Sequence, residues 1–282
     1  GASMLVGRTG LVHGTIGGGA LEHEAIAAAQ SALSKGSDRI DKRPLGPQLG
    51  QCCGGSVTLL TEIWTSDRLS RFGEGIVARP TPGVMAEPTL QVSRALARLR
   101  DGRGPRNPAF LNGWMIEPVH HPKRDIWIWG AGHVGRAIVG VLEPLPDLKI
   151  NWVDSGRERF PDAIPSRVSA LFADNPAELA SLSSETSEHY VLTYSHALDL
   201  EICHRVLNRQ FAFLGLIGSA TKRARFRARL KSLGHSVAQI DRMVCPIGDP
   251  DLGKHPQEIA LGVATEILHR RTMEDRLREK RA

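Results

Sequence analysis

Two adjacent cysteines, Cys52 and Cys53, are the residues of this chain best suited to soft-ligand or sulfur chemistry. They lie in the stretch QLGQCCGG, between Gly50 and the pair Gly54-Gly55. Glycine neighbours leave the backbone bare, and an exposed thiolate binds soft metals or reacts with sulfur. Zinc is disfavoured, because adjacent cysteines chelate it poorly and no second pair is spaced to help. Two interpretations stay open at this point: a functional thiol pair, or a tight turn at the entry to a strand.

A glycine motif in the second half of the chain is typical of nucleotide binding. Residues 125–142, DIWIWGAGHVGRAIVGVL, combine a short apolar strand, the spacing Gly130-x-Gly132-x-x-Gly135 and a helix. The first glycine permits a tight turn, the second lets a phosphate approach the backbone, and the third lets the helix pack on the strand. Asp154, at the end of the next predicted strand, is placed to bind a ribose hydroxyl. The alternative is that the glycines only close a strand–helix turn.

A second glycine turn precedes a basic helix that Ser219 can cap. Ligands of open α/β sheets bind at the carboxyl ends of the strands. We therefore expect Gly218 and Ser219 to meet the glycine motif and residues 193–196 in one crevice that favours anions. His133 and His196 are the only acid–base candidates near this crevice, which is not a clear catalytic set. The alternative for His196 is a hydrogen bond at the start of a helix.

Length and composition are those of a protein with one or two domains. The 282 residues are 41% hydrophobic, which is enough for a core. No apolar run is long enough to span a membrane, and there is no secretory signal pattern. Four cysteines are too few for a disulfide scaffold, so we expect a reducing cytoplasm. The chain starts Gly-Ala-Ser rather than with Met, and we expect its native start to be missing or processed.

The net charge of +6 comes largely from two predicted helical stretches, residues 222–229 and 276–281. No aromatic stacking platform accompanies these cations, which disfavours nucleic acid as a partner. Solvated helix faces, or a patch for an anionic small molecule or an acidic partner, are favoured instead. Arg157 and Arg159 either favour an additional phosphate near Asp154 or are surface charges.

Two domains must position these residues. The Pro- and Gly-rich stretch 106–123 predicts a linker between an N-terminal domain (1–105) and a C-terminal domain (124–282). The N-terminal part predicts an α+β unit, with a hairpin at 7–10, a helix over 20–33, a strand over 56–64 and a helix over 88–100. In the C-terminal part, strands alternate with helices, which predicts an α/β fold with a Rossmann-like parallel sheet covered on both faces. The expected strands are 125–129, 149–153, 167–172, 189–193 and 211–217, and a last helix is expected over 256–272.

Five segments, in one order along nearly the whole chain, resemble the XdhC/CoxI family. They are GTIGGGALE (14–22), LGQCCGGSVTLLTE (49–62), WGAGHVG (129–135), GLIGSATKRARF (215–226) and CPIG…LGKHPQEIA (245–260). The resemblance implies a CoxI-like N-terminal domain, a C-terminal Rossmann domain and an accessory role in the maturation of xanthine dehydrogenase and related molybdenum hydroxylases. At residues 193–196 the chain has Thr-Tyr-Ser-His where the family has a Thr-His-Asp-like stretch, so the role of that stretch is not carried over.

The resemblance also implies a cargo and partners. Such proteins bind the molybdenum cofactor (molybdopterin), shield it while a cysteine desulfurase supplies its sulfido ligand, and help to insert it into xanthine dehydrogenase. By this resemblance Cys52 or Cys53 contacts molybdenum or handles sulfur. The same implied pocket contains Gln51, Gly54, Gly55, Gly17, Gly18, Gly19 and Glu22. The ligand of the Rossmann domain stays open between a nucleotide, part of the cofactor and nothing.

The prediction is a cytoplasmic cofactor chaperone rather than an enzyme with turnover, and it allows a homodimer. One alternative is an NAD(P)-dependent oxidoreductase that uses the Rossmann domain, which the lack of a clear catalytic set disfavours. The other alternative is a scaffold that docks the desulfurase on xanthine dehydrogenase without touching the cofactor.

Overall fold

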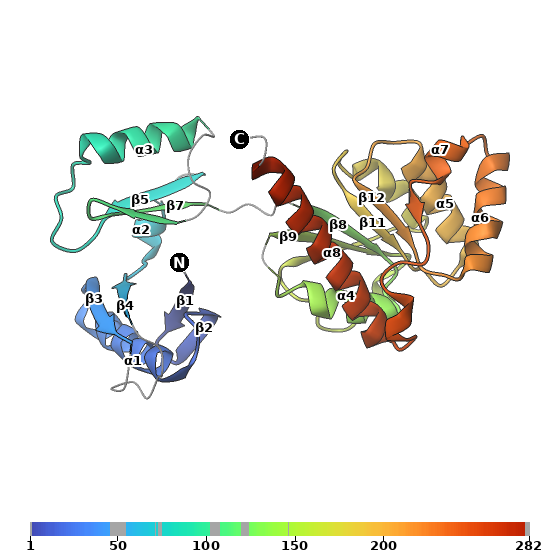
Figure 1. Ribbon diagram of the computed structural model, residues 1–282. Helices are drawn as coiled ribbons and strands as arrows, with labels where there is room; N and C mark the ends of the chain where they lie inside the picture. The colour runs from blue at the N-terminus through green and yellow to red at the C-terminus, as the bar shows by residue number, and fades with distance from the viewer. Residues whose placement is uncertain are drawn as a thin grey trace. The chain divides into compact units, whose positions relative to one another are not determined.

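A computed structural model describes residues 2–45, 55–70, 72, 75–101, 108–119, 124–145 and 147–279. The chain forms two compact units, Gly1–His120 and His121–Ala282 (Figure 1). Four of the predicted site residues lie outside the described residues: Gln51, Cys52, Cys53 and Gly54. Within the described part of the chain, no helix is long and apolar enough to cross a membrane.

The N-terminal unit begins with a hairpin, as predicted. Strands β1 (Ser3–Gly7) and β2 (Gly10–Thr15) pair in antiparallel fashion and meet at Gly7 and Gly10. Helix α1 (Gly19–Lys35) follows and ends at Gly36, whose φ of +71° suits the left-handed conformation common after a helix.

A second antiparallel pair follows α1. Strand β3 (Arg39–Pro44) pairs along its whole length with β4 (Ser56–Thr61), and Pro44 lies opposite Ser56. The segment 46–54, which carries the two cysteines, therefore connects two paired strands. The strand predicted to follow the cysteines is confirmed.

The third sheet of this unit has the order β5-β7-β6. Helix α3 packs on it through Val92, which lies among Trp114 and Ile116 of the sheet. The short helix α2 comes just before β5 in the chain. The bounds of these elements are α2 (Ser66–Ser70), β5 (Ile76–Pro80), α3 (Leu90–Arg100), β6 (Ala109–Leu111) and β7 (Trp114–Pro118).

Strands β6 and β7 occupy residues that the sequence predicts as linker, and for these residues the prediction is wrong. Asn112 and Gly113 both have positive φ, 47° and 77°, and form the two-residue turn that joins the strands. Turns of this kind favour Asn-Gly because both central residues need positive φ. Gly113 thus belongs to a tight hairpin turn rather than to a connection between domains.

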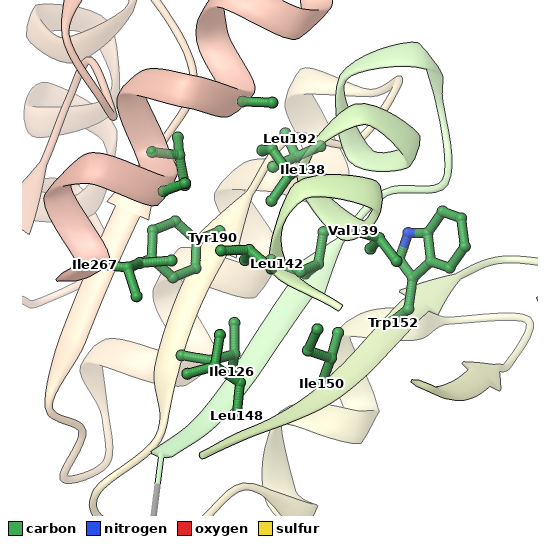
Figure 2. Close-up of a cluster of buried hydrophobic side chains, with 14 of the residues drawn as sticks. Ile126, Ile138, Val139, Leu142, Leu148, Ile150, Trp152, Tyr190, Leu192 and Ile267 are labelled. Atoms are coloured by element: carbon green, nitrogen blue, oxygen red, sulfur yellow. The ribbon is translucent and has the colours of Figure 1, made fainter. Parts of the chain in front are cut away.

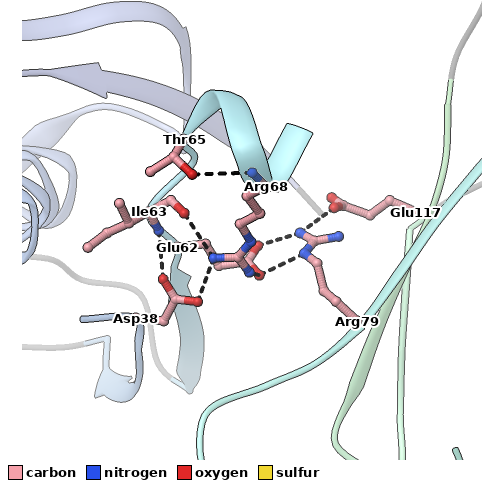
Figure 3. Close-up of polar contacts among 7 residues, drawn as sticks. All are labelled: Asp38, Glu62, Ile63, Thr65, Arg68, Arg79 and Glu117. Carbon is pink, nitrogen blue, oxygen red and sulfur yellow. Dashed lines mark hydrogen bonds and ion pairs between the residues drawn. The ribbon is translucent and has the colours of Figure 1, made fainter. Parts of the chain in front are cut away.

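An ion network around the buried side chain of Glu62, the residue after β4, reaches the third sheet (Figure 3). Oε1 of Glu62 accepts from Nε of Arg79 at 2.7 Å and from Nη2 of Arg68 at 2.9 Å, and Glu62 and Arg79 are each only 8% exposed at the side chain. Arg79 also pairs with Glu117 of β7, at 2.5 Å. Both guanidinium groups lie over the ring of Trp64, 4.9 and 5.1 Å from its centroid.

The C-terminal unit is a six-stranded parallel sheet with the order β10-β9-β8-β11-β12-β13. Numbered from the first strand of this unit the order is 3-2-1-4-5-6, the order of dinucleotide-binding folds. The predicted α/β fold and the five predicted strands are confirmed. The bounds are β8 (Arg124–Trp129), α4 (His133–Leu142), β9 (Leu148–Asp154), β10 (Val168–Phe172), β11 (Glu188–Val191), α5 (His196–Leu207), β12 (Phe213–Leu216), α6 (Ala220–Ser232), α7 (Val237–Ile240), β13 (Met243–Val244) and α8 (Pro256–Glu279), with 3-10 turns η2 (Arg157–Arg159), η3 (Pro176–Leu182) and η4 (Pro250–Leu252).

Helices cover both faces of this sheet, as predicted (Figure 1). On one face, α4 and α8 pack through residues such as Ile138 and Ile267 against Ile126 and Ile150 of the strands (Figure 2). On the other face, α5 and α6 pack through Cys203, Phe226 and Leu230, among others. Because both faces are buried, apolar side chains such as Ile126, Ile128 and Leu214 lie on the strands with almost no exposure.

Candidate functional site

Three loops meet at the carboxyl edge of the parallel sheet. They follow β8, β11 and β12, which are neighbours in the sheet. Leu192 N donates to Trp129 O at 2.9 Å and Ile217 N donates to Val191 O at 2.9 Å, so the strands stay paired up to the loops. The chain order reverses between β8 and β11, and ligands of such sheets bind at this reversal.

The glycines of the first loop have the roles expected from their spacing. Gly130 has a φ of +125°, and a Cβ there would lie 2.5 Å from Leu192 O. A Cβ on Gly135 would lie 2.0 Å from Gly130 O, so this glycine lets α4 pack on β8. A Cβ on Gly132 would meet nothing within 4 Å, which leaves its backbone open to approach. His133, the first residue of α4, is exposed.

Asp154 lies beside the glycine turn but is already engaged. Its Oδ2 accepts from Ala131 N at 2.6 Å, and its Oδ1 accepts from Ser155 N at 2.7 Å. Arg159 lies 3.5 Å from the same Oδ1, and Asp154 is only 2% exposed. The carboxylate therefore holds the turn together, and its burial restricts the access of a ribose hydroxyl. The ribose-binding role of Asp154 stays a prediction.

Arg159 also stacks over the ring of Tyr194, with its guanidinium carbon 4.5 Å from the ring centroid. Arg159 follows β9 and Tyr194 follows β11, and these strands flank β8 on its two sides. The contact between Arg159 and Tyr194 therefore spans the end of β8, where the glycine turn begins. Tyr194 is 67% exposed, so this contact lies at the surface. Arg159 is thus engaged by Asp154 and Tyr194, and its role toward an additional phosphate stays a prediction.

Asp199 and Lys222 join the second and third loops. Oδ1 of Asp199 accepts from the N–H of Thr193 at 2.9 Å and from its hydroxyl at 2.8 Å. Lys222 Nζ donates to Oδ2 at 2.7 Å. Asp199 is completely buried, so Lys222 supplies its counter-charge. Lys222 was not among the predicted site residues, although its position three residues after the helix cap Ser219 could have indicated that it faces this edge.

A groove of about 570 Å³ lies between the start of α5 and the first turns of α6. His196 and Ser219, predicted from the sequence, both line it. His196 is exposed there, and Ser195 rather than His196 makes the hydrogen bond that caps α5. Ser219 caps α6 as predicted, by accepting from Lys222 N. The other lining residues are Thr221, Lys222, Arg225, Phe226, Ala228 and Arg229. The residues of the glycine turn do not line this groove, so the single crevice expected from the sequence is split.

In the N-terminal unit, Glu22 organises the loop of three glycines. Gly17, Gly18 and Gly19 all have positive φ, 121°, 74° and 70°. Oε2 of Glu22 accepts from Ile16 N at 2.9 Å, from Gly18 N at 3.1 Å and from the hydroxyl of Thr15. The bond from Thr15, followed by those from the two amides, lowers the pKa of the Glu22 carboxyl. An anion of the protein itself thus occupies these amides.

The side of this loop on which the Cα atoms of Gly17 and Gly18 lie is open. A Cβ on Gly17 or on Gly18 would meet nothing within 4 Å. Leu21, in the first turn of α1, lines a small hollow together with Arg43 and Leu59 of the β3–β4 pair. Helix α1, which follows the glycine loop, therefore lies next to the two strands that the cysteine segment connects.

The described cysteines are poor candidates for chemistry. Cys203 and Cys245 are both buried, and burial raises the pKa of each thiol. No three His, Cys, Asp or Glu side chains come together to hold a metal ion in the part of the chain that the structure describes. The flanks of the other two cysteines are described: Leu45 N donates to Gly55 O at 2.8 Å, which closes the β3–β4 pair at that end.

Comparison with known proteins finds similarity along the chain. The model of the XdhC Rossmann domain matches residues 126–267, and the model of the XdhC and CoxI family matches residues 1–42. The uncharacterized protein YqeB of Escherichia coli (strain K12) is 25% identical over 268 residues, which cover 95% of this chain but only 40% of YqeB. The chain thus spans less than half the length of this relative.

A crystal structure has the same fold. It is described as that of a xanthine dehydrogenase from Bacillus halodurans, is 16% identical, and aligns with a TM-score of 0.62 over 92% of this chain and 82% of that one. At this identity the likeness extends to the fold alone. The match of the Rossmann-domain model to half of the chain, together with the match at residues 1–42, shows that the protein belongs to the XdhC and CoxI family.

Proposed function

We propose that this protein carries the molybdenum cofactor during the maturation of xanthine dehydrogenase. In this role it binds the cofactor as cargo, supports its sulfuration by a cysteine desulfurase, and passes it to the apo-enzyme. Family membership supports the general role, and the XdhC and CoxI model covers the predicted glycine loop. A reducing compartment such as the cytoplasm would keep the cysteines as thiols.

The closed end of the β3–β4 pair is the observation that carries this proposal. Leu45 and Gly55 are joined by a backbone hydrogen bond, so the segment that contains Cys52 and Cys53 leaves β3 and enters β4 at one place. Thiolates are the protein ligands that best suit a soft metal–sulfur centre. With Cys203 and Cys245 buried, these two are the remaining thiols of the chain.

The glycine loop has a defined task in this proposal. Glu22 occupies the amides of Ile16 and Gly18, so those N–H groups are not the ones that would meet the cofactor phosphate. The bare Cα atoms of Gly17 and Gly18 leave room for a flat pterin to approach the backbone. Glu22 is therefore a positioning residue, which holds the loop in the shape that keeps this face open.

A second candidate is an NAD(P)-dependent oxidoreductase, which the 3-2-1-4-5-6 strand order and the open backbone at Gly132 favour. Two observations weigh against it. The carboxylate of Asp154 is used inside the protein, and neither His133 nor His196 makes a hydrogen bond to a carboxylate of the described residues. Fluorescence of a bound nicotinamide, with hydride transfer to a substrate, would support this candidate instead.

Cofactor retention tests the proposal. Wild type and the single variants Cys52→Ala and Cys53→Ala are mixed with molybdenum cofactor under anaerobic conditions, passed through gel filtration, and assayed for molybdenum. We expect the wild type to retain molybdenum and at least one variant to lose most of it while it stays folded. Cys203→Ala is the matched control, because it removes a thiol from the core of the other unit, and it should retain molybdenum. Absence of retained molybdenum in the wild type would refute the proposal.

A further inference from the structure

We propose that the groove between α5 and α6 is a binding site for the diphosphate group of a small ligand, separate from the glycine turn. The groove has a volume of about 570 Å³, which lies within the roughly 300–1,000 Å³ usual for small-molecule sites. It lies at the carboxyl edge of the sheet, where His196 starts α5 and Ser219 caps α6. The inference does not depend on cofactor binding by the N-terminal unit.

The helix α6 is rich in cations: it carries six Lys and Arg residues and no acid in thirteen positions. Three of these cations, Lys222, Arg225 and Arg229, line the groove. Arg225 and Arg229 both line the groove, and neither forms an ion pair with a described residue. Two of the other cations on α6 are neutralised, Lys222 by Asp199 and Arg227 by Asp241.

The spacing of the two arginines suits a compact dianion. Residues four apart on a helix have Cβ atoms about 5–6 Å apart, so a single ligand reaches both guanidinium groups. Like charges at this spacing destabilise a helix in the absence of a counter-ion. Guanidinium groups bind phosphate oxygens in a bidentate way, which makes arginine well suited to a diphosphate.

Neutral groups in the groove complete a phosphate environment. The hydroxyls of Ser219 and Thr221 lie at the start of α6, where the partial positive charge of the helix favours an anion. The N–H groups of Ala220 and Thr221 have no helical carbonyl one turn before them. Lys222, whose charge is balanced by Asp199, also lines the groove and is held in place there.

A small phosphorylated ligand fits these features better than an acidic peptide. A peptide would need an extended basic surface, whereas the two arginines without an ion pair and the two hydroxyls all line one groove beside a helix start. The groove is distinct from the glycine turn, where Asp154 accepts from Ala131 N and Arg159 stacks on Tyr194.

Calorimetric titration of the full chain with inorganic pyrophosphate at low ionic strength tests this inference. We expect the wild type to bind, and the double variant Arg225→Gln/Arg229→Gln to bind about tenfold more weakly or worse, since hydrogen bonds to charged groups are lost. Added salt should weaken binding by the wild type, because both arginines are exposed.

A matched double variant distinguishes binding at a defined site from non-specific attraction to the positive charge of α6. Arg223→Gln/Lys231→Gln removes the same number of positive charges from α6, at exposed positions that do not line the groove. This variant should bind pyrophosphate within about twofold of the wild type. Equal loss in both doubles would overturn the inference in favour of non-specific attraction. If the wild type binds a Glu-rich peptide but does not bind pyrophosphate, the inference is overturned in favour of an acidic protein partner.

Discussion

The Nζ atom of Lys222 lies 2.7 Å from Oδ2 of Asp199, and this ion pair joins helix α5 to helix α6. Asp199 is fully buried, and its other oxygen holds the backbone and the hydroxyl of Thr193. The pair therefore fixes two of the three loops at the carboxyl edge of the sheet.

Loss of one partner of this pair should be costly. The substitution Lys222→Met leaves the carboxylate of Asp199 buried without a counter-charge, and we expect a loss of about 3 kcal/mol in the free energy of unfolding. The double variant Lys222→Met/Asp199→Asn removes both charges and keeps an acceptor for Thr193, so it should recover a large part of this loss. Urea unfolding measures both. A Lys222→Met variant as stable as the wild type would contradict the role assigned to the pair.

Two glycines of α4 should respond to alanine in opposite directions. A Cβ on Gly135 would lie 2.0 Å from the carbonyl oxygen of Gly130, so Gly135→Ala must move the helix or the turn and should cost about 2 kcal/mol or more. Gly140 lies in the same helix, is exposed, and a Cβ there meets nothing within 4 Å. Gly140→Ala should therefore stabilise the protein by about 0.5–1 kcal/mol through helix propensity. Thermal or urea unfolding measures the stability of both variants. Equal changes in the free energy of unfolding would contradict the packing role of Gly135.

His189 should make the stability of the C-terminal unit depend on pH. Burial lowers the pKa of His189 to about 3, with Asp125 opposing the shift and Arg209 adding to it. Its Nδ1 accepts from Trp129 Nε1 at 3.2 Å, so the ring is neutral in the folded protein. A histidine in the unfolded chain has a pKa of about 6.5. Below this pH the unfolded state therefore binds more protons than the folded state. The stabilisation is thus present above about pH 6.5 and is lost as the pH falls, by up to about 1.4 kcal/mol per pH unit.

The variant His189→Asn isolates this contribution. Its amide oxygen offers an acceptor near the position of Nδ1 but does not titrate. We expect the difference in unfolding free energy between wild type and variant to change in favour of the variant between about pH 7 and about pH 4. A difference that is constant with pH would show that His189 does not carry the dependence.

In the N-terminal unit, Glu62 should be the residue on which the ion network depends. It accepts from both Arg68 and Arg79, and its side chain is 8% exposed. Glu62→Gln leaves two guanidinium groups without this charge, and we expect a loss of about 3 kcal/mol. Asp67→Asn, at an exposed position of α2, should change stability by less than about 0.5 kcal/mol. Urea unfolding compares them, and similar values for the two variants would contradict a structural role of the network.

Much of the fold follows from local patterns in the sequence. Alternating apolar strands and helices indicate a parallel sheet, and the spacing of Gly130, Gly132 and Gly135 indicates the strand–helix turn, because each feature involves neighbouring residues only. The hairpin of β6 and β7 could also have been predicted. Asn112-Gly113 between apolar residues favours a two-residue turn, but the surrounding prolines favoured a linker.

The candidate site was less predictable, because its partners are distant in the sequence. Ser219 and Glu22 bond to groups within a few residues, so their positions at helix starts indicate their roles. Lys222 and Asp199 are 23 residues apart, and only the tertiary fold brings them together. Likewise, a carboxylate at the end of the second strand predicts a ribose ligand, but the sequence cannot show that Asp154 accepts from Ala131 N.

Delivery of the cargo tests the central claim most directly. Protein loaded with molybdenum cofactor is mixed with cofactor-free xanthine dehydrogenase, and the recovery of xanthine oxidation is followed over time. The account predicts that loaded wild type restores activity faster than the same concentration of free cofactor, and that the Cys52→Ala/Cys53→Ala variant gives no advantage over free cofactor. If free cofactor restores activity as well as the loaded wild type, or if the double cysteine variant performs as well as the wild type, the protein is not a carrier that holds the cofactor through these thiols.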